Sequence, residues 1–193
     1  MYEILKKKYG QNFLIDQNII KKICNLIPNK YLKVIEIGPG DGRLTEKIIS
    51  FEPKEFKIIE IDTDLIPFLQ SKFKENQKIQ IINDDILKYQ LSDRVDLIIS
   101  NLPYNISSQI LVKICLMETI PNSLILMFQK EFAERLLNEK LNSLNSLVRC
   151  FYEINNSFNV SKNCFRPIPK IDSTVLLFNK REKPLLRKNE IIK

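Results

Sequence analysis

Short, almost unbroken apolar runs alternate along this chain with helix-like segments, and this alternation limits the possible folds more than any other feature. The pattern predicts strands at residues 33–37, 56–61, 79–82, 95–100 and 123–128. It predicts helices at residues 43–50, 64–73, 106–117 and 130–138, and an earlier helix that Asp16 caps and that stops near Pro28. Apolar runs that do not alternate with polar residues are typical of strands covered on both faces. Repeated strand–helix units therefore predict right-handed crossovers and an open parallel sheet.

The last two predicted strands depart from this parallel pattern. They cover residues 154–160 and 173–179, and the loop around residues 164–170 between them is too short for a helical crossover. We therefore expect an α/β fold whose seven-stranded sheet is mostly parallel, with the last strand antiparallel. Residues 1–180 should form one domain, and residues 181–193 a charged tail or truncated linker.

Composition excludes several kinds of chemistry. The chain has no histidine, which removes a His general base and most zinc chemistry. Its four cysteines form no Cys-x-x-Cys pair and lie among apolar residues, which indicates buried free thiols and no metal site. No apolar run reaches the roughly 18 residues that span a bilayer, and no signal peptide is recognisable. We expect a cytoplasmic protein with no membrane partner; an organellar matrix fits the same features.

Basic residues concentrate at the two ends of the chain. Residues 1–33 hold seven Lys and Arg against two acids, and residues 162–193 hold nine against three, within a net charge of +7. The middle is therefore mildly acidic. Basic ends favour a polyanionic partner gripped at its edges, although lysines that merely solubilise the ends would give the same pattern.

Three of the four glycines lie in one loop directly after the first predicted strand. Residues 36–42 read EIGPGDG, a GxGxG spacing that differs from the GxGxxG of dinucleotide binders. Glycines let the main chain approach a ligand closely, and open α/β sheets bind ligands at the carboxyl ends of their strands. We take Glu36, Gly38 and Gly40 as candidate ligand contacts.

Acidic residues follow the next two predicted strands. Glu60 lies 22 positions after Gly38, where a carboxylate can accept both hydroxyls of a ribose. Asp84 and Asp85 follow the next strand, where a carboxylate could accept a hydrogen bond from an adenine amine. Each acid alone could be an ordinary solvated turn residue. Together with the glycine loop they indicate a nucleoside ligand.

The segment Asn101, Leu102, Pro103 and Tyr104 follows the fourth predicted strand and indicates the reaction. An adenine amine is a poor nucleophile because its lone pair is delocalised into the ring. The Asn101 side-chain oxygen and the Leu102 carbonyl could accept its two N–H groups and draw the lone pair out. Pro103 would stiffen the loop, and Tyr104 offers a ring on which an extruded base can stack. Such catalysis by positioning and oriented dipoles needs no histidine.

With these motifs in this order, the chain resembles the ribosomal RNA adenine dimethyltransferase family, above all its small-subunit branch in bacteria and organelles. The resemblance covers about residues 6–180. Besides Glu60 and Asp85, it rests on YGQNFLID at 9–16, GPG at 38–40, NLPYNIS at 101–107, QKE at 129–131 and FRPIPKIDS at 165–173.

The resemblance implies a Rossmann-like class I methyltransferase fold with S-adenosyl-L-methionine as the methyl donor. The implied cofactor contacts are Gln11, Asn12, Leu14, Gly38, Glu60, Asp85 and Asn101. Phe165 would close over the target base opposite Tyr104. The implied partner is small-subunit rRNA or the pre-ribosomal small subunit, and we expect a monomer. The implied reaction, a step of ribosome biogenesis, dimethylates two adjacent adenosines in a hairpin loop near the RNA's 3′ end. We expect phosphate contacts from Lys6, Lys7, Lys8, Arg166 and Lys170.

Two departures from the family pattern are visible. The family usually has a Tyr-Gly-containing segment where this chain has residues 141–146, so the packing and substrate contacts of that segment are not carried over. The family also continues into a small helical domain that helps docking on RNA. This sequence stops at Lys193, so we expect a truncated or reduced protein with weaker RNA affinity.

Three other functions share parts of the pattern. A large-subunit adenine methyltransferase of macrolide-resistance type has the same core, and Leu102 with the segment 10–14 favours the small-subunit branch. A ribosome-assembly or RNA-binding factor that has lost catalysis is a second alternative, against which the intact segment at residues 101–104 argues. DNA adenine methylation is more distant, because those enzymes usually carry Pro where Leu102 stands.

Overall fold

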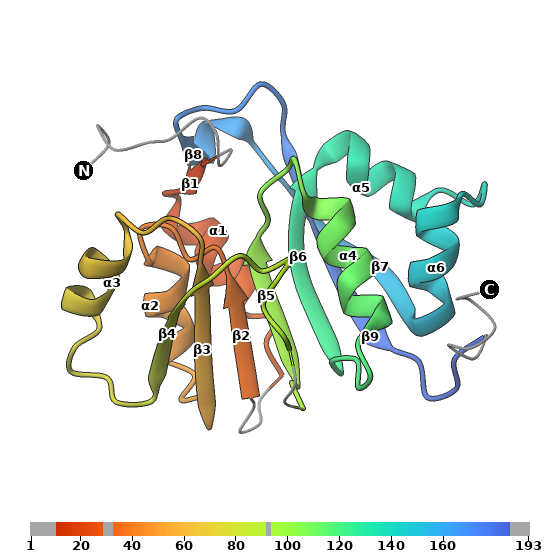
Figure 1. The fold of residues 1–193 in the computed structure, drawn as a ribbon. Coiled ribbons are helices and arrows are strands. Elements are labelled where there is room, and N and C mark those ends of the chain that lie inside the picture. Colours follow the sequence, from red (N-terminus) through yellow and green to blue (C-terminus); the bar gives the residue numbers. More distant parts are fainter. Residues whose placement is uncertain (1–10, 29–32, 92–93, 186–193) are drawn as a thin grey trace.

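The computed structural model describes residues 11–28, 33–91 and 94–185. Seven strands form one sheet in the order β4-β3-β2-β5-β6-β9-β7 (Figure 1). These strands are β2 (Lys33–Ile37), β3 (Glu55–Glu60), β4 (Ile79–Asn83), β5 (Leu97–Asn101), β6 (Ser123–Gln129), β7 (Tyr152–Val160) and β9 (Ser173–Lys180). The seven predicted strands are confirmed, with bounds that differ by one or two residues.

Strand β9 is antiparallel to both of its neighbours, β6 and β7, whereas the other pairs are parallel. The predicted mostly parallel sheet with an antiparallel last strand is therefore confirmed. The register places Ser173, the first residue of β9, opposite Gln129, the last residue of β6. The start of β9 thus lies at the sheet edge where the parallel strands end.

Helices cover both faces of the sheet (Figure 1). One face carries α1 (Gln17–Cys24), α2 (Arg43–Ile49) and α3 (Ile66–Lys72), and the other carries α4 (Ser107–Leu116), α5 (Lys130–Leu137) and α6 (Ser143–Phe151). Asp16 caps α1 as predicted, because its carboxylate accepts from the main-chain N–H groups of Asn18 and Ile19 at 2.8 and 3.0 Å. These hydrogen bonds lower the pKa of Asp16.

Two hydrophobic cores follow from strands that bury both faces. In β6, Leu124, Leu126 and Phe128 pack towards α4, α5 and α6, whereas Ile125 and Met127 pack towards the opposite face. Successive residues of a strand point to opposite faces, so an unbroken apolar run feeds both cores.

Helix α6 was not predicted. Its N-cap is Asn142, which exchanges hydrogen bonds with Asn145 in a capping box. Asn145 is fully buried, and its Nδ2 lies 3.1–3.4 Å from three main-chain carbonyls, of Arg135, Asn138 and Lys140. The Asn145 side chain therefore ties the start of α6 to the end of α5 and to the turn between the two helices.

A second, two-stranded sheet was also not predicted. Strand β1 (Phe13–Leu14) pairs antiparallel with β8 (Phe165–Arg166), which follows a short 3-10 helix, Lys162–Cys164. Ile15 N–H donates to the carbonyl of Cys164 at 2.8 Å beside this pair. These contacts tie the segment 11–15 to the loop before β9.

The four cysteines are free thiols, as predicted. Cys24, Cys115 and Cys150 are buried, and Cys164 is half-buried. After β9, Arg181 pairs with Glu153 at 3.0 Å, and Leu185 N–H donates to the carbonyl of Cys150 at 2.9 Å. The rest of the expected tail lies outside the described residues.

Candidate functional site

A cleft of about 910 Å³, counting the solvent in its mouth, lies at the carboxyl ends of the central parallel strands. Its wall combines the segment 11–14, the glycine loop after β2, the end of β3, the turn after β4 and the loop after β5. All the sequence-predicted cofactor contacts line this one cleft: Gln11, Asn12, Leu14, Glu36, Gly38, Gly40, Glu60, Asp85 and Asn101. Segments up to 90 residues apart in the chain therefore meet here.

The glycine loop needs its glycines for two different reasons. Gly38 and Gly40 have φ of +64° and +59°, a left-handed conformation that strains other residues. A Cβ on Gly38 would meet no protein atom within 4 Å, so this glycine presents bare main chain to open space. A Cβ on Gly40 would lie 2.8 Å from the ring of Phe13, which therefore packs directly on the loop.

Two buried carboxylates stand behind the loop. The carboxylate of Glu36 accepts a 2.6 Å hydrogen bond from the Thr45 hydroxyl, and burial raises the pKa of Glu36 to about 8. Glu60 is 5% exposed and accepts from the N–H groups of Asp62 and Gly40 at 2.9 and 3.3 Å. Burial raises the pKa of Glu60 as well. Glu60 thereby joins the end of β3 to the glycine loop.

The turn after β4 carries two half-buried acids at the cleft wall. Asp85 N–H donates to the Asp84 carboxylate at 2.7 Å, and the Asp85 carboxylate accepts from Leu87 N–H at 2.9 Å. One oxygen of Asp85 is thus used to hold the turn, and both acids line the cleft. The position of these two carboxylates at the cleft wall agrees with the expected hydrogen-bond acceptor for an adenine amine.

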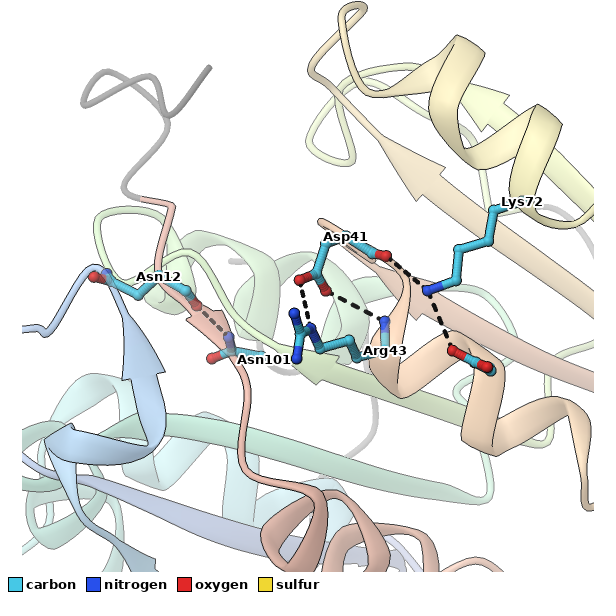
Figure 2. Close-up of polar contacts among 6 residues, drawn as sticks. Asn12, Asp41, Arg43, Lys72 and Asn101 are labelled. Carbon is cyan, nitrogen blue, oxygen red and sulfur yellow. Dashed lines mark hydrogen bonds and ion pairs between the residues drawn. The ribbon is translucent and has the colours of Figure 1, made fainter. Parts of the chain in front are cut away.

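Asn101 ends β5 and faces the segment 11–14. Its Nδ2 donates to the main-chain carbonyl of Asn12 at 2.8 Å. Figure 2 shows the amide nitrogen turned to Asn12 and the amide oxygen turned away from it. This hydrogen bond fixes the orientation of the Asn101 amide. Because Nδ2 donates to Asn12, Oδ1 is the end that can accept a hydrogen bond from a ligand.

Tyr104 stands at the outer end of the same loop. Its hydroxyl lies 2.9 Å from the Ser173 hydroxyl at the start of β9, and burial raises the pKa of Tyr104. Its carbonyl accepts from the Ser107 hydroxyl at 3.2 Å, where α4 begins. Leu102 is 2% exposed and anchors the loop in the core, and Pro103 lines the cleft beside it. The four-residue loop is therefore held at both ends.

The segment 11–15 lies across the cleft as a strap. Gln11 Nε2 donates to the Asp62 carboxylate beyond β3 at 2.8 Å, and the Asn12 carbonyl accepts from Asn101 beyond β5. The strap thus bridges two strand ends that β2 separates. Sequence reasoning placed Gln11 and Asn12 here by resemblance but did not find Asp62, whose role depends on this long-range contact.

Sequence reasoning also missed Arg43, which lines the cleft. Its Nε pairs with the Asp41 carboxylate at 2.7 Å, and the Asp41 carbonyl accepts from Lys72 Nζ at 3.1 Å (Figure 2). Lys72 also pairs with Glu46 at 3.2 Å. Lys72, which does not line the cleft, therefore ties α3 to the glycine loop and to α2. The charged residues beside the glycines were the only sequence signal for them.

Phe165 requires a correction. We expected it to close over a target base, but its side chain is fully buried, in the core with Phe13 and Leu14. It is not among the residues that line the cleft. The pairing of β8 with β1 puts Phe165 opposite Leu14 and turns the ring into that core.

The expected phosphate contacts are placed in part. Arg166 ends β8, Lys170 lies on the loop between β8 and β9, and both are exposed. The guanidinium of Arg166 donates to the carbonyls of Phe165 and Asn163 at 2.7 and 3.2 Å. Lys6, Lys7 and Lys8 lie outside the described residues.

Within residues 11–28, 33–91 and 94–185, no group of three His, Cys, Asp or Glu side chains could hold a metal ion. In the same part of the chain, no helix combines the length and apolarity needed to cross a bilayer.

Together, this strand order, the antiparallel β9 and a glycine loop at the carboxyl end of β2 define a Rossmann-like fold of the class I methyltransferases. The sequence profile of the ribosomal RNA adenine dimethylase family matches residues 3–192. The chain belongs to that family, and the expectation of an rRNA adenine dimethyltransferase is confirmed at the level of the family.

Individual proteins agree with this assignment. The ribosomal RNA small subunit methyltransferase A of Pelagibacter ubique is 41% identical, over 94% of this chain and 72% of its own length. The crystal structure of a dimethyladenosine transferase from Plasmodium falciparum has a TM-score of 0.80 and 30% identity, and the match covers 88% of this chain and 64% of that one. The 23S rRNA methyltransferase ErmE has a TM-score of 0.82 and 26% identity, with 93% and 74% covered.

Proposed function

We propose that this protein uses S-adenosylmethionine to dimethylate the exocyclic amines of two adjacent adenosines in a small-subunit rRNA hairpin near the 3′ end. The observation that carries the proposal is the hydrogen bond from Asn101 Nδ2 to the Asn12 carbonyl. It turns the amide so that Oδ1 remains to accept from an amine in the cleft.

The residues of the cleft fit the methyl donor. The main chain at Gly38 borders open space that no Cβ occupies, so a ligand can lie against it. Glu60, at the end of β3, is positioned to accept from ribose hydroxyls, and Asp85 from an adenine amine. S-adenosylmethionine would supply a methyl group already activated on a sulfonium.

The loop after β5 would prepare the nucleophile. Asn101 Oδ1 and the Leu102 carbonyl accept the two N–H groups of the adenine amine and draw its lone pair out of the ring. The amine nitrogen forms a bond to the methyl carbon as the carbon–sulfur bond breaks, and the surplus proton leaves to water. Tyr104 presents a ring for the extruded base, and its hydrogen bond to Ser173 holds that ring in place. Placement and fixed dipoles supply the catalysis.

The small subunit is the favoured substrate. The Pelagibacter relative, 41% identical, is named a small-subunit methyltransferase, whereas the 23S rRNA enzyme ErmE is 26% identical. Exposed Arg166 at the end of β8 and exposed Lys170 on the following loop would contact phosphates. We take the active form to be a monomer.

Methylation of each purified ribosomal subunit with isotope-labelled donor tests this proposal. We expect label in small subunits that lack the modification and none in large subunits. Label only in large subunits would instead support the macrolide-resistance type. Donor binding by calorimetry without transfer to either subunit would support an RNA-binding assembly factor.

A further inference from the structure

A second cavity opens beside the cleft, between the loop after β5 and the exposed side of α5. It spans about 1050 Å³, counting the solvent in its mouth. The residues that line it are Tyr104, Ser107, Gln129, Glu131, Phe132, Glu134, Arg135 and Asn138. Glu131, Glu134 and Arg135 of α5 and Asn138 at its C-cap project from one face of the helix, because each lies three or four positions from two of the others.

Tyr104 contributes to the walls of both cavities. Its hydroxyl is fixed against Ser173, so the side chain stands as a shared partition. Consecutive nucleotides are covalently linked. When one base enters the cleft along one side of Tyr104, a neighbouring nucleotide is therefore brought to the other side.

The lining of the second cavity has the two elements that single-stranded bases need. The Arg135 guanidinium lies 5.3 Å from the centre of the Phe132 ring, which itself stacks on Phe128 with ring centres 5.1 Å apart. A guanidinium plane backed by an aromatic ring is a platform on which a base can stack. The platform is held from beneath, because Phe128 belongs to the core.

The charged side chains at the rim of the second cavity determine which base can bind there. Glu131 and Glu134 are exposed carboxylates, which accept hydrogen bonds and repel phosphate. A base edge that offers an amine satisfies them, whereas an edge with only ring nitrogens as acceptors does not. Adenine meets this condition through its exocyclic amine, and purine, which lacks that amine, does not.

We propose that this second cavity holds the base next to the methylated adenosine and selects a neighbour with an exocyclic amine through Glu131 and Glu134. The inference rests on the proposed function and deepens it, because it assigns the neighbouring nucleotide a site of its own. A second adenosine beside the target carries such an amine.

The test compares two hairpin RNAs that differ in one atom group, with adenine or purine at the position next to the target. Equilibrium binding is measured by fluorescence anisotropy, and methyl transfer is measured separately. We expect the wild-type protein to bind the adenine hairpin about threefold to tenfold more tightly than the purine hairpin, as for the loss of one solvent-exposed hydrogen bond. Glu134→Ala and Glu131→Ala should each reduce this ratio.

Glu139→Ala is the matched control. Glu139 is exposed just beyond α5, does not line the cavity, and loses the same charge. All three variants should gain some affinity for any RNA because a negative charge is removed. Only the two cavity variants should lose discrimination between the hairpins.

The outcomes separate the two proposals. Equal binding of both hairpins by the wild type, or discrimination that survives in Glu131→Ala and Glu134→Ala, would overturn the cavity assignment. The absence of methyl transfer to either hairpin would count against the proposed function instead, and the binding ratio would still decide whether the cavity selects a neighbour.

Discussion

The ring of Phe13 lies so close to Gly40 that a Cβ at Gly40 would stand 2.8 Å from two of its carbons. Phe13 belongs to the strap over the cleft, and Gly40 belongs to the loop that borders the cleft floor. The two parts of the site are therefore packed together before any ligand binds. The strap is in turn paired with β8 through Leu14 and Phe165.

Gly40→Ala should damage the fold and the site together. A left-handed alanine costs about 1–2 kcal/mol, and the overlap with Phe13 adds roughly 1–3 kcal/mol, so unfolding free energy should fall by the sum. Gly38→Ala is the control, since it carries the same strain but no overlap. Urea denaturation measures both. Equal losses in the two variants would contradict the packing of Phe13 on Gly40, and Phe13→Leu should recover part of the Gly40→Ala loss.

Glu36 makes stability depend on pH. Burial raises its folded pKa to about 8, above the ordinary value of 4.5, so the folded state holds the proton more tightly. Its stabilising effect is full below about pH 4.5 and is lost as pH rises to about 8. Glu36→Gln keeps an uncharged side chain, so it should be more stable than the wild type at pH 9, by at most about 5 kcal/mol. At pH 4.5 the two should converge.

Urea denaturation of the donor-free protein at pH 4.5, 7 and 9 checks this expectation. Glu139→Gln, which makes the same change at an exposed position, is the control and should follow the wild type. A constant difference between Glu36→Gln and the wild type across this range would show that Glu36 does not titrate as described.

Asn101→Ala should separate catalysis from binding. Removal of one oriented acceptor from a preorganised site costs about 10²–10³ in kcat. RNA affinity should change little, because one neutral side chain is a small part of an RNA interface dominated by phosphate contacts. Single-turnover transfer and RNA binding are compared with those of Asn105→Ala, an exposed asparagine four residues away. Equal losses of transfer and binding would contradict the role of Asn101.

Tyr104 should act through its ring. Tyr104→Phe removes only the hydrogen bond to Ser173, so we expect transfer within about threefold of wild type, the effect of one neutral hydrogen bond. Tyr104→Ala also removes the ring, and stacking on a base contributes roughly 1–3 kcal/mol, so transfer should fall about 10- to 100-fold. If both variants lost activity equally, the hydroxyl rather than the ring would carry the function.

Arg166 and Lys170 should set part of the salt dependence of RNA binding. Their joint replacement by Gln removes two phosphate contacts, which should reduce the slope of log affinity against log salt by about 1.5. Lys54 and Lys78, exposed at the amino ends of β3 and β4, serve as the matched pair of controls. Replacement of Lys6, Lys7 and Lys8 should act in the same direction. An unchanged slope would leave the loop between β8 and β9 outside the RNA interface.

The apolar runs predicted the sheet, and the clustered glycines predicted the ligand loop, because each signal lies within a few consecutive residues. Unbroken runs such as residues 123–128 must be buried on both faces, and three clustered glycines have few other uses. The ligand-facing acids could be placed because parallel strands bring their carboxyl ends to one edge. Resemblance to the family added Gln11, Asn12 and Leu14.

The parts that sequence reasoning missed depend on distant partners. Strands β1 and β8 are two residues long and pair across more than 150 positions, so neither carries a local signal. That pairing buries Phe165, which the resemblance to the family placed at the target base. The start of α6 depends on Asn145, whose side chain donates to carbonyls of α5 and of the turn that follows it. The polar residues at this start therefore do not resemble a buried helix in the sequence.

Nucleoside mass spectrometry of small-subunit RNA after incubation with this protein and S-adenosylmethionine is the most direct measurement. We predict the appearance of N6,N6-dimethyladenosine in hairpin fragments from the 3′ end, and its loss with Asn101→Ala. Unmodified adenosines with a folded, donor-binding wild-type protein would contradict the assignment of the cleft and its loop as a working methyl-transfer site.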